Sequence, residues 1–287
     1  MLLAVSDSFA RADDGLRLFV RVVGDTGPIV IVPGAAWLEG HLNPLHHAGR
    51  RIVFYDTQAR GRSEAGSRQR LTFDYEVSDL EAVRRHVGGE RVSLIGWSYL
   101  GAVVALYASK HPARVESLAM LCPMAARPGP FEGMAPYLDR NLAREAEMEE
   151  RLDELRRLAE GDPSPESWRA FQLLRATIRM DDPAAAERVI ANPWQYEQEW
   201  APNVEPTLEA LFESLDDFDW RPAMAVVDAP ALVVHGESDG PAEVRQEWAD
   251  AFANGCMLRL PNTGHYPFIE APGQLFPALE QHLDGST

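Results

Sequence analysis

Short, continuous apolar runs recur along this chain, and they constrain its fold more than any other feature. They cover residues 28–32, 51–55, 91–95, 115–121 and 230–236. Residues 16–23 form an alternating run rich in branched residues, and residues 256–260 a further short strand pattern. A strand without polar alternation is buried on both faces, as in a parallel sheet that is covered by helices. Helical patterns lie between the runs, at 75–86, 99–109 and 242–253, and a last one ends near Leu283. The sequence therefore predicts an α/β fold with a mostly parallel sheet and helices on both faces.

This alternation stops after residue 127 and resumes near residue 221. The segment 128–220 shows helical patterns separated by prolines, and no strand pattern. It holds 22 acidic residues and nine arginines, which is −13 of the chain's net charge of −17. We therefore expect a core made of residues 1–127 and 221–287, with a helical cap over 128–220 inserted into it.

The net charge and the cysteine content restrict the partners and the location of the protein. A charge of −17 repels nucleic acid and anionic membranes. No apolar run approaches the ~20 residues that a membrane helix needs, and the apolar start of the chain is too short for a signal peptide. Cys122 and Cys256 cannot form a disulfide framework. We expect a cytoplasmic protein that binds neither nucleic acid nor membrane. The sequence is compatible with a monomer and with a homo-oligomer.

The sharpest motif is Gly-Trp-Ser-Tyr-Leu-Gly at 96–101. It follows a predicted buried strand and opens a predicted helix, which is the context of a nucleophile elbow. Such a tight turn favours small residues two positions before and two after the serine. Gly96 meets the first condition and Leu100 departs from the second. The alternative is that Ser98 only caps the helix.

A serine hydroxyl needs a base within hydrogen-bond reach, and the base needs a carboxylate to orient it. His265 lies in a loop after the last predicted strand, between a glycine and a proline, and is the best candidate for the base. Asp239 follows the strand 230–236 at the end where the functional side chains of such sheets gather. Glu237 is the alternative acid. The predicted order along the chain is Ser98, Asp239, His265.

A negatively charged oxygen that forms in the reaction must also be stabilised. The N–H group of Tyr99, at the start of a helix, is one candidate donor. The loop 33–37 supplies the second, and Ala35 is favoured because small residues let the backbone approach a substrate. The alternative for this loop is an ordinary Pro-Gly turn.

Taken together, these segments resemble the α/β-hydrolases that carry a helical cap, in the branch that includes proline iminopeptidases. The resemblance implies an eight-stranded sheet, Ser98 as nucleophile, Asp239 as acid and His265 as base. Pro33, Leu100 and the pair Gln58-Ala59 depart from the usual pattern, and the loop lacks the His-Gly-Gly-Pro-Gly run of those peptidases. The segments that carry it are 33–34, 55–56 with 61–63, 96–98, 235–239, 264–267 and 270–272.

The cap is expected to select the substrate. Glu197 and Glu199 are candidates to hold an amine, with Trp200 shielding them from water, as cap carboxylates do in the resembled peptidases. The alternative is that they belong to a solvated acidic face. Trp37 and Trp97 would give the pocket an aromatic wall.

The sequence thus predicts a serine hydrolase acting through an acyl-enzyme on a small ester, an amide or an N-terminal peptide bond. The substrate is a small molecule or a short peptide, and no cofactor or metal is implied. The same three residues can also serve C–C bond hydrolysis, lyase chemistry or cofactor-free oxidation. A receptor that kept the fold without turnover is the alternative from a different class.

Overall fold

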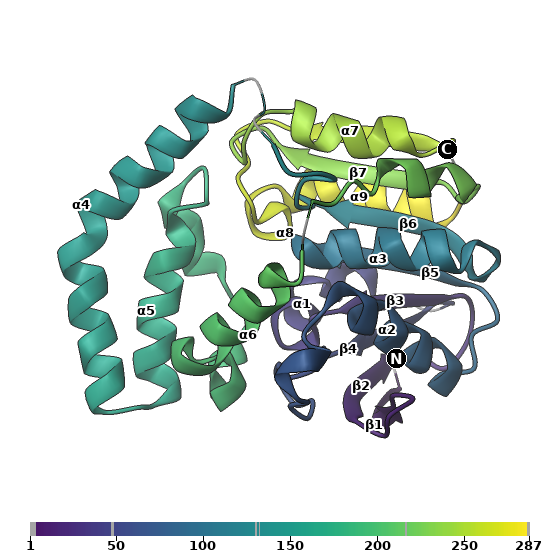
Figure 1. Cartoon of the computed structure of the whole chain (residues 1–287), viewed down its shortest axis with the longest axis horizontal. Helices are drawn as coiled ribbons and strands as arrows, with labels where there is room; N and C mark the ends of the chain where they lie inside the picture. The colour runs from purple at the N-terminus through teal and green to yellow at the C-terminus, as the bar shows by residue number, and fades with distance from the viewer. Residues whose placement is uncertain (1–3, 47–48, 130, 132, 216, 286–287) are drawn as a thin grey trace.

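The computed structural model describes residues 4–46, 49–129, 131, 133–215 and 217–285. An eight-stranded sheet runs through its centre in the order β1-β2-β4-β3-β5-β6-β7-β8 (Figure 1). The β1/β2 and β2/β4 pairs are antiparallel and every other neighbouring pair is parallel. The strands are β1 (Val5–Arg11), β2 (Arg17–Val23), β3 (Ile29–Pro33), β4 (Arg51–Tyr55), β5 (Val92–Trp97), β6 (Val115–Leu121), β7 (Ala231–Gly236) and β8 (Gly255–Leu260).

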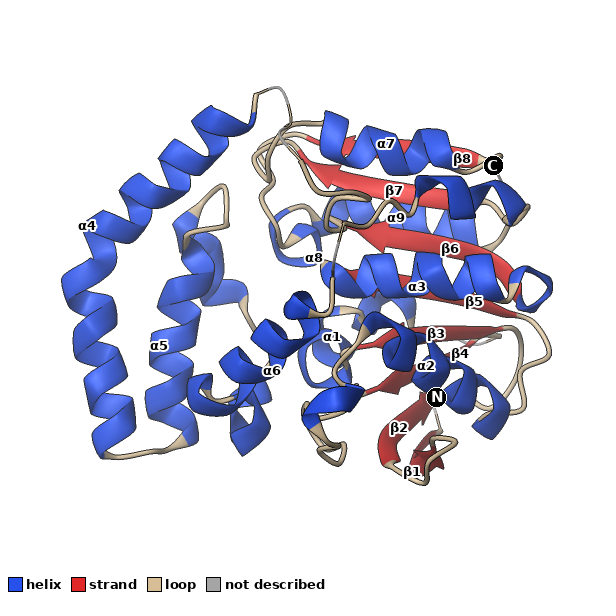
Figure 2. Ribbon diagram, in the orientation of Figure 1, coloured by secondary structure: helices blue, strands red, loops and turns tan. Residues whose placement is uncertain are grey.

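The inner parallel strands are largely buried on both faces, as the sequence predicts, whereas β8 at the edge of the sheet is mostly half-buried or exposed. In β3 every residue is buried; Ile29 and Ile31 join one apolar cluster, while Val30 and Val32 join another on the opposite face. Helices cover both faces (Figure 2). The first face is covered by α2 (Phe73–His86), α3 (Tyr99–Lys110) and α7 (Glu243–Ala251), and the second by α1 (Ala35–His41), α8 (Pro267–Glu270) and α9 (Pro272–Leu283).

The apolar runs and the two further strand patterns predict seven strands, and the eighth is β1. This edge strand pairs in full register with β2, from Val5 opposite Val23 to Arg11 opposite Arg17. Only Ala10 of its seven residues is buried. An edge strand that stays largely in solvent carries no continuous apolar run, so its pattern is too weak to detect.

Three α-helices stand apart from the sheet between β6 and β7 (Figure 1). They are α4 (Met134–Gly161), α5 (Pro165–Thr177) and α6 (Ala201–Glu213), and the turns η4 (Pro183–Arg188), η5 (Pro193–Gln195) and η6 (Glu197–Glu199) join α5 to α6. We refer to them together as the cap. Helix α5 begins where Ser164 and Ser167 form a capping box, with Pro165 at its first position.

Helix α4 has 28 residues but buries only Leu152 and Ala159. These two pack with Trp168, Phe171 and Trp194 in a small apolar cluster inside the cap. Most of the remaining residues of α4 are polar, although Leu138, Leu142 and Leu158 are exposed apolar side chains. Among the described residues, no helix is both long and apolar enough to cross a membrane.

Candidate active site

A sharp turn between β5 and α3 presents Ser98. Its φ of 58° and ψ of −129° lie in a region that a non-glycine residue rarely occupies, which is typical of strain held at a functional site. Gly96 makes the turn possible, because a β-carbon there would lie 2.3 Å from the carbonyl oxygen of Leu100 and 2.8 Å from the α-carbon of Gly101. The strand-turn-helix context predicted from residues 96–101 is therefore present.

Leu100 does not distort this turn. It lies in the first turn of α3, and its side chain fills the space above Gly34, at the end of β3. Gly34 leaves that space open because it has no side chain. A larger residue after the serine is thus matched by a glycine in the facing loop.

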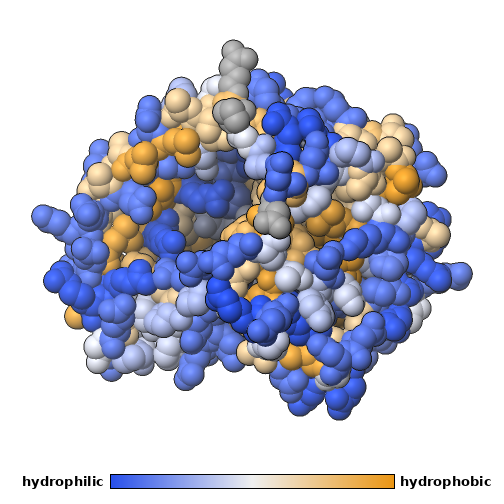
Figure 3. Space-filling model, in the orientation of Figure 1, coloured by the Kyte–Doolittle hydropathy of each residue, from blue (hydrophilic) through white to orange (hydrophobic). Residues whose placement is uncertain are grey.

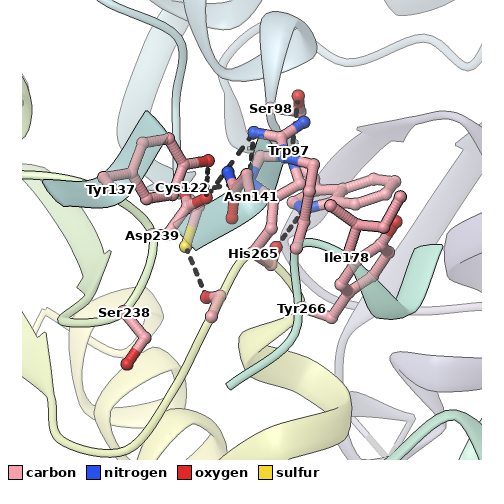
Figure 4. Close-up of polar contacts among 12 residues, drawn as sticks. Trp97, Ser98, Cys122, Tyr137, Asn141, Ile178, Ser238, Asp239, His265 and Tyr266 are labelled. Atoms are coloured by element: carbon pink, nitrogen blue, oxygen red, sulfur yellow. Dashed lines mark hydrogen bonds and ion pairs between the residues drawn. The ribbon is translucent and has the colours of Figure 1, made fainter. Parts of the chain in front are cut away.

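The structure brings Ser98, His265 and Asp239 together at the carboxyl ends of the strands (Figure 4). Ser98 Oγ lies 3.0 Å from His265 Nε2, and His265 Nδ1 lies 2.9 Å from Asp239 Oδ2. Both His265 and Asp239 are buried. Glu237, the alternative acid, is exposed and pairs with Arg259. The chain therefore aligns a hydroxyl, an imidazole and a carboxylate in one hydrogen-bonded series.

The environment sets the charge of this series. Burial, then the positive charge of Arg179, lowers the pKa of His265 to about 4, although Asp239 opposes the shift. Burial alone would raise the pKa of Asp239, but the charges of His265 and Arg245 hold it well below its ordinary value. At neutral pH the imidazole is therefore neutral and able to accept a proton, and the carboxylate is ionised.

The two predicted oxyanion donors lie at the first positions of helices. In the loop after β3, Gly34 N–H donates to Tyr55 O and Ala36 N–H donates to Asp56 Oδ1. Ala35, at the start of α1, and Tyr99, at the start of α3, have no acceptor inside their helices. Tyr99 lines the cavity beside Ser98, whereas Ala35 is buried and is not among the residues that line it.

Three further residues contact Asp239, and sequence reasoning missed all of them. Arg245 of α7 donates to Asp239 Oδ2 at 2.5 Å and to the backbone oxygen of the same residue at 2.8 Å. Tyr137 of α4 donates to Oδ1 at 3.3 Å, and Arg179 of the cap lies 3.5 Å from the same oxygen. Arginines and tyrosines far away in the chain carry no motif that would single them out.

A cavity of about 1230 Å³ lies between the cap and Ser98, and the surface is hollowed beside the core in Figure 3. Trp37 and Trp97 line it, as predicted, with their ring centroids 6.0 Å apart. Trp97 also donates from Nε1 to His265 O at 2.8 Å, so it supports the loop of the candidate base. Other apolar lining residues are Tyr99, Leu100, Phe171, Trp194 and Tyr266.

The three cap residues predicted to bind an amine are placed differently from one another. Glu199 is buried and lines the cavity, but Arg60 donates to both of its oxygens, at 2.9 and 2.7 Å. Glu197 is exposed and lies outside the cavity lining. Trp200 also lies outside the lining; it stacks on Trp168 in the interior of the cap. Of the two predicted carboxylates, the structure therefore places Glu199 at the cavity, with its charge balanced by Arg60, and Glu197 away from it.

One group of metal-ligand types lies at the site: donor atoms of Cys122, Asp239 and His265 fall within 4.8 Å of one another. His265 Nδ1 is already engaged with Asp239, and burial raises the pKa of the Cys122 thiol above its ordinary value. Arg179 and Arg245 also place two positive charges beside Asp239. A cation would meet protonated or occupied ligands and like charge, so these residues fit a metal poorly.

Comparison with known proteins gives a family and several relatives. A family model described as alpha/beta hydrolase fold matches residues 27–272. A proline iminopeptidase of Thermoplasma volcanium is 27% identical over 233 residues, which cover 73% of this chain and 70% of the relative. A non-heme haloperoxidase of Rhodococcus erythropolis is 26% identical over 244 residues, covering 80% and 81%.

Among solved structures, the chain resembles a 2-hydroxy-6-oxo-6-phenylhexa-2,4-dienoate hydrolase from Rhodococcus sp. strain RHA1. The TM-score is 0.70 at 19% identity, over 98% of this chain and 100% of that one. At this identity the match shows a shared fold.

Proposed function

Because this chain belongs to the alpha/beta hydrolase fold family, we propose that it is a serine hydrolase that acts through an acyl-enzyme. The observation that carries the proposal is the series from Ser98 Oγ to His265, 3.0 Å, and from His265 to Asp239, 2.9 Å. Each distance lies within hydrogen-bond range, so a proton can pass from the hydroxyl to the imidazole.

In the proposed reaction, Ser98 Oγ attacks a carbonyl carbon while His265 Nε2 takes the hydroxyl proton. Asp239 accepts the hydrogen bond from Nδ1–H and stabilises the imidazolium that forms. The N–H groups of Tyr99 and Ala35 hold the developing oxyanion. His265 then gives its proton to the leaving group, and the Ser98 ester remains. Water, deprotonated by His265, attacks this ester; His265 then returns the proton to Ser98 Oγ as the acid is released.

The cavity favours a substrate with an apolar or aromatic group. Trp37, Trp97 and Trp194 line it together, and aromatic walls of this kind hold flat or apolar groups by burial. Glu199 is neutralised by Arg60, so an ammonium group would have to compete with a guanidinium that makes two hydrogen bonds. Other carboxylates line the cavity at Glu145, Glu149, Asp153 and Glu209. We favour a small ester over an N-terminal peptide bond because of the aromatic wall and the pairing of Glu199.

Turnover of two chromogenic substrates tests this choice. p-Nitrophenyl acetate reports ester hydrolysis, and proline p-nitroanilide reports removal of an N-terminal residue that carries a free amine. We expect release of p-nitrophenol in wild-type protein, loss of turnover in Ser98→Ala, and little cleavage of the anilide. Preferred cleavage of the anilide would favour the peptidase activity, and no turnover of either would favour a receptor.

A further inference from the structure

A short segment of the cap, residues 178–181, lies directly on the loop that carries His265. The backbone N–H of His265 donates to the backbone oxygen of Arg179 at 2.9 Å. On the other side, Asp181 N–H donates to Glu270 Oε1 at 2.6 Å. We call residues 178–181 the cap strap.

Two further residues tie the strap down. Arg144 of α4 donates to the backbone oxygens of Ile178, Met180 and Asp181. The Ser238 hydroxyl, next to Asp239, donates to the Asp181 carboxylate. The strap is thus bonded both to the loop of the candidate base and to the loop of the candidate acid.

The close approach of the strap depends on Gly264. A β-carbon at Gly264 would lie 2.3 Å from Arg179 O and 2.8 Å from Asp181 N, distances that no real side chain tolerates. The absence of a side chain at Gly264 therefore lets the cap backbone reach His265.

Arg179 then extends its side chain over the bond between His265 and Asp239. Its Nη2 lies 3.2 Å from His265 Nδ1 and 3.5 Å from Asp239 Oδ1. When Nδ1 carries the proton that it donates to Asp239, it cannot accept a hydrogen from Arg179, because both groups are donors. The guanidinium therefore pairs with the carboxylate of Asp239. Its positive charge beside the imidazole disfavours a second positive charge on the ring.

We propose that Arg179 is a positioning residue through which the cap holds the base loop in place and keeps the imidazole of His265 in its neutral, proton-accepting form. The importance of that form rests on the proposed function, since only a neutral imidazole can take the proton of Ser98. The side chain of Arg179 is 43% exposed and lines the cavity, so substitution there removes charge without opening a sealed core.

The other groups around the imidazole do not explain this arrangement by themselves. Asp239 favours a charged ring, and Arg245 of α7, which pairs with Asp239, disfavours it less strongly than Arg179 does. Cys122, at the end of β6, is a protonated thiol, and Tyr266, beside the ring, keeps its proton because burial raises its pKa to about 12. Glu270 of α8 is engaged by three backbone N–H groups, and Trp97 is uncharged. Of the positive charges, Arg179 alone among the described residues comes from the cap and lies within 3.5 Å of the imidazole.

The test is the titration of the His265 imidazole, followed by NMR in full-length protein with ¹⁵N-labelled histidine. A His265→Asn variant assigns the signal. The variants are Arg179→Met, which removes the charge, and Arg179→Lys, which keeps it. Arg175→Met is the matched control, because Arg175 lies in the last turn of α5, just before the strap, and lines the same cavity but pairs with Glu205.

We expect the ring in Arg179→Met to titrate at least about one pH unit above wild type. Arg179→Lys keeps the positive charge, so His265 should titrate close to its wild-type pH in that variant. Arg175→Met should leave the titration of His265 unchanged. The acid limb of kcat/KM for ester hydrolysis should move by the same amount in the same direction. Every variant keeps the backbone oxygen of residue 179, and Arg179→Gln replaces the Met variant if that one fails to fold.

An unchanged His265 titration in Arg179→Met, or an equal shift in Arg175→Met, would overturn the proposal. The NMR titration does not depend on turnover. A shifted ring in a protein that hydrolyses no ester would therefore leave the positioning role in place and contradict the proposed function instead.

Discussion

Leu100 lies against Gly34, with its Cδ1 3.1 Å from the point that a β-carbon on Gly34 would occupy. The loop that supplies a candidate oxyanion donor and the residue that departs from the usual elbow pattern are thus fitted to each other. Gly34 also has φ of 87°, in the left-handed region that favours glycine.

This contact predicts that substitutions at the two positions are not additive. Gly34→Ala should cost roughly 1–3 kcal/mol of unfolding free energy, partly from its backbone conformation and partly from the clash with Leu100. In a Leu100→Ala background the clash is gone, so the same change should cost less, by roughly 0.5–1 kcal/mol. Urea unfolding of the two single variants and the double variant measures the difference, and strict additivity would contradict the packing described here.

The strained turn at Ser98 predicts that Gly96→Ala disrupts the elbow. The new methyl group would meet backbone atoms of α3, which cannot move aside as a flexible side chain can. We expect at least a hundredfold loss of esterase activity with a clear loss of stability. Gly273→Ala is the control, because no atom lies within 4 Å of a β-carbon there and alanine favours the helix by roughly 0.5–1 kcal/mol. Equal activity in the two variants would rule out the crowding at Gly96.

The buried pair of Arg60 and Glu199 predicts a large cost for removing one partner. In Glu199→Ala the guanidinium of Arg60 stays buried without its carboxylate, which costs roughly 3–5 kcal/mol. Glu116→Ala removes a similar pair at the surface, where both side chains are more than half exposed, and should cost less than about 1 kcal/mol. Thermal or urea unfolding compares them. A cost for Glu199→Ala no larger than for Glu116→Ala would contradict a structural role for the pair.

Glu76 of α2 predicts a pH dependence of stability. Burial, then the charge of Asp79, raises its pKa from 4.5 to about 8, and its Oε2 has no hydrogen-bond partner among the described residues. A group whose pKa is higher in the folded state binds more protons there, so the contribution of Glu76 to stability falls as pH rises from about 4.5 to 8. Buried histidines with lowered pKa values, His265 among them, contribute with the opposite sign below about pH 6.5. The slope is at most about 1.4 kcal/mol per pH unit.

Glu76→Gln should remove this contribution, so the unfolding free energy of the variant relative to wild type should rise with pH between 5 and 8, measured by urea unfolding. Glu81→Gln is the control on the same helix. The Arg84 hydrogen bond lowers the pKa of Glu81 to about 2, so its contribution is lost only below the ordinary pKa of 4.5. A wild-type slope that persists in Glu76→Gln would mean that Glu76 is ionised in the folded protein.

Much of the fold and part of the site follow from local patterns. Buried strands carry continuous apolar runs, and Gly96 with Ser98 marks a turn whose shape is fixed by nearby backbone atoms. The strand β1 was not predicted, because it is exposed at an edge of the sheet and carries no continuous apolar run. The roles of Arg179 and Arg245 could not be predicted for another reason. Their contacts with Asp239 join distant parts of the chain, and no local sequence pattern shows which residue an arginine will pair with.

The pairing of Glu199 shows the same limit. The neighbouring Trp200 predicts a carboxylate shielded from water, and Glu199 is buried. Its partner, Arg60, lies 139 residues earlier in a loop after β4, where the sequence gives no sign of an approach by the cap. Local surroundings could predict the burial, but the balancing charge depends on how the cap sits on the core.

The most direct test of the account is covalent labelling by a fluorophosphonate probe, followed by intact mass and peptide mapping. Wild-type protein should gain one label, on the peptide that contains Ser98, because His265 activates that hydroxyl. His265→Gln should react at least a hundredfold more slowly, and Ser98→Ala should gain no label. An unlabelled wild-type protein, or labelling that persists undiminished in Ser98→Ala, would contradict Ser98 as the nucleophile.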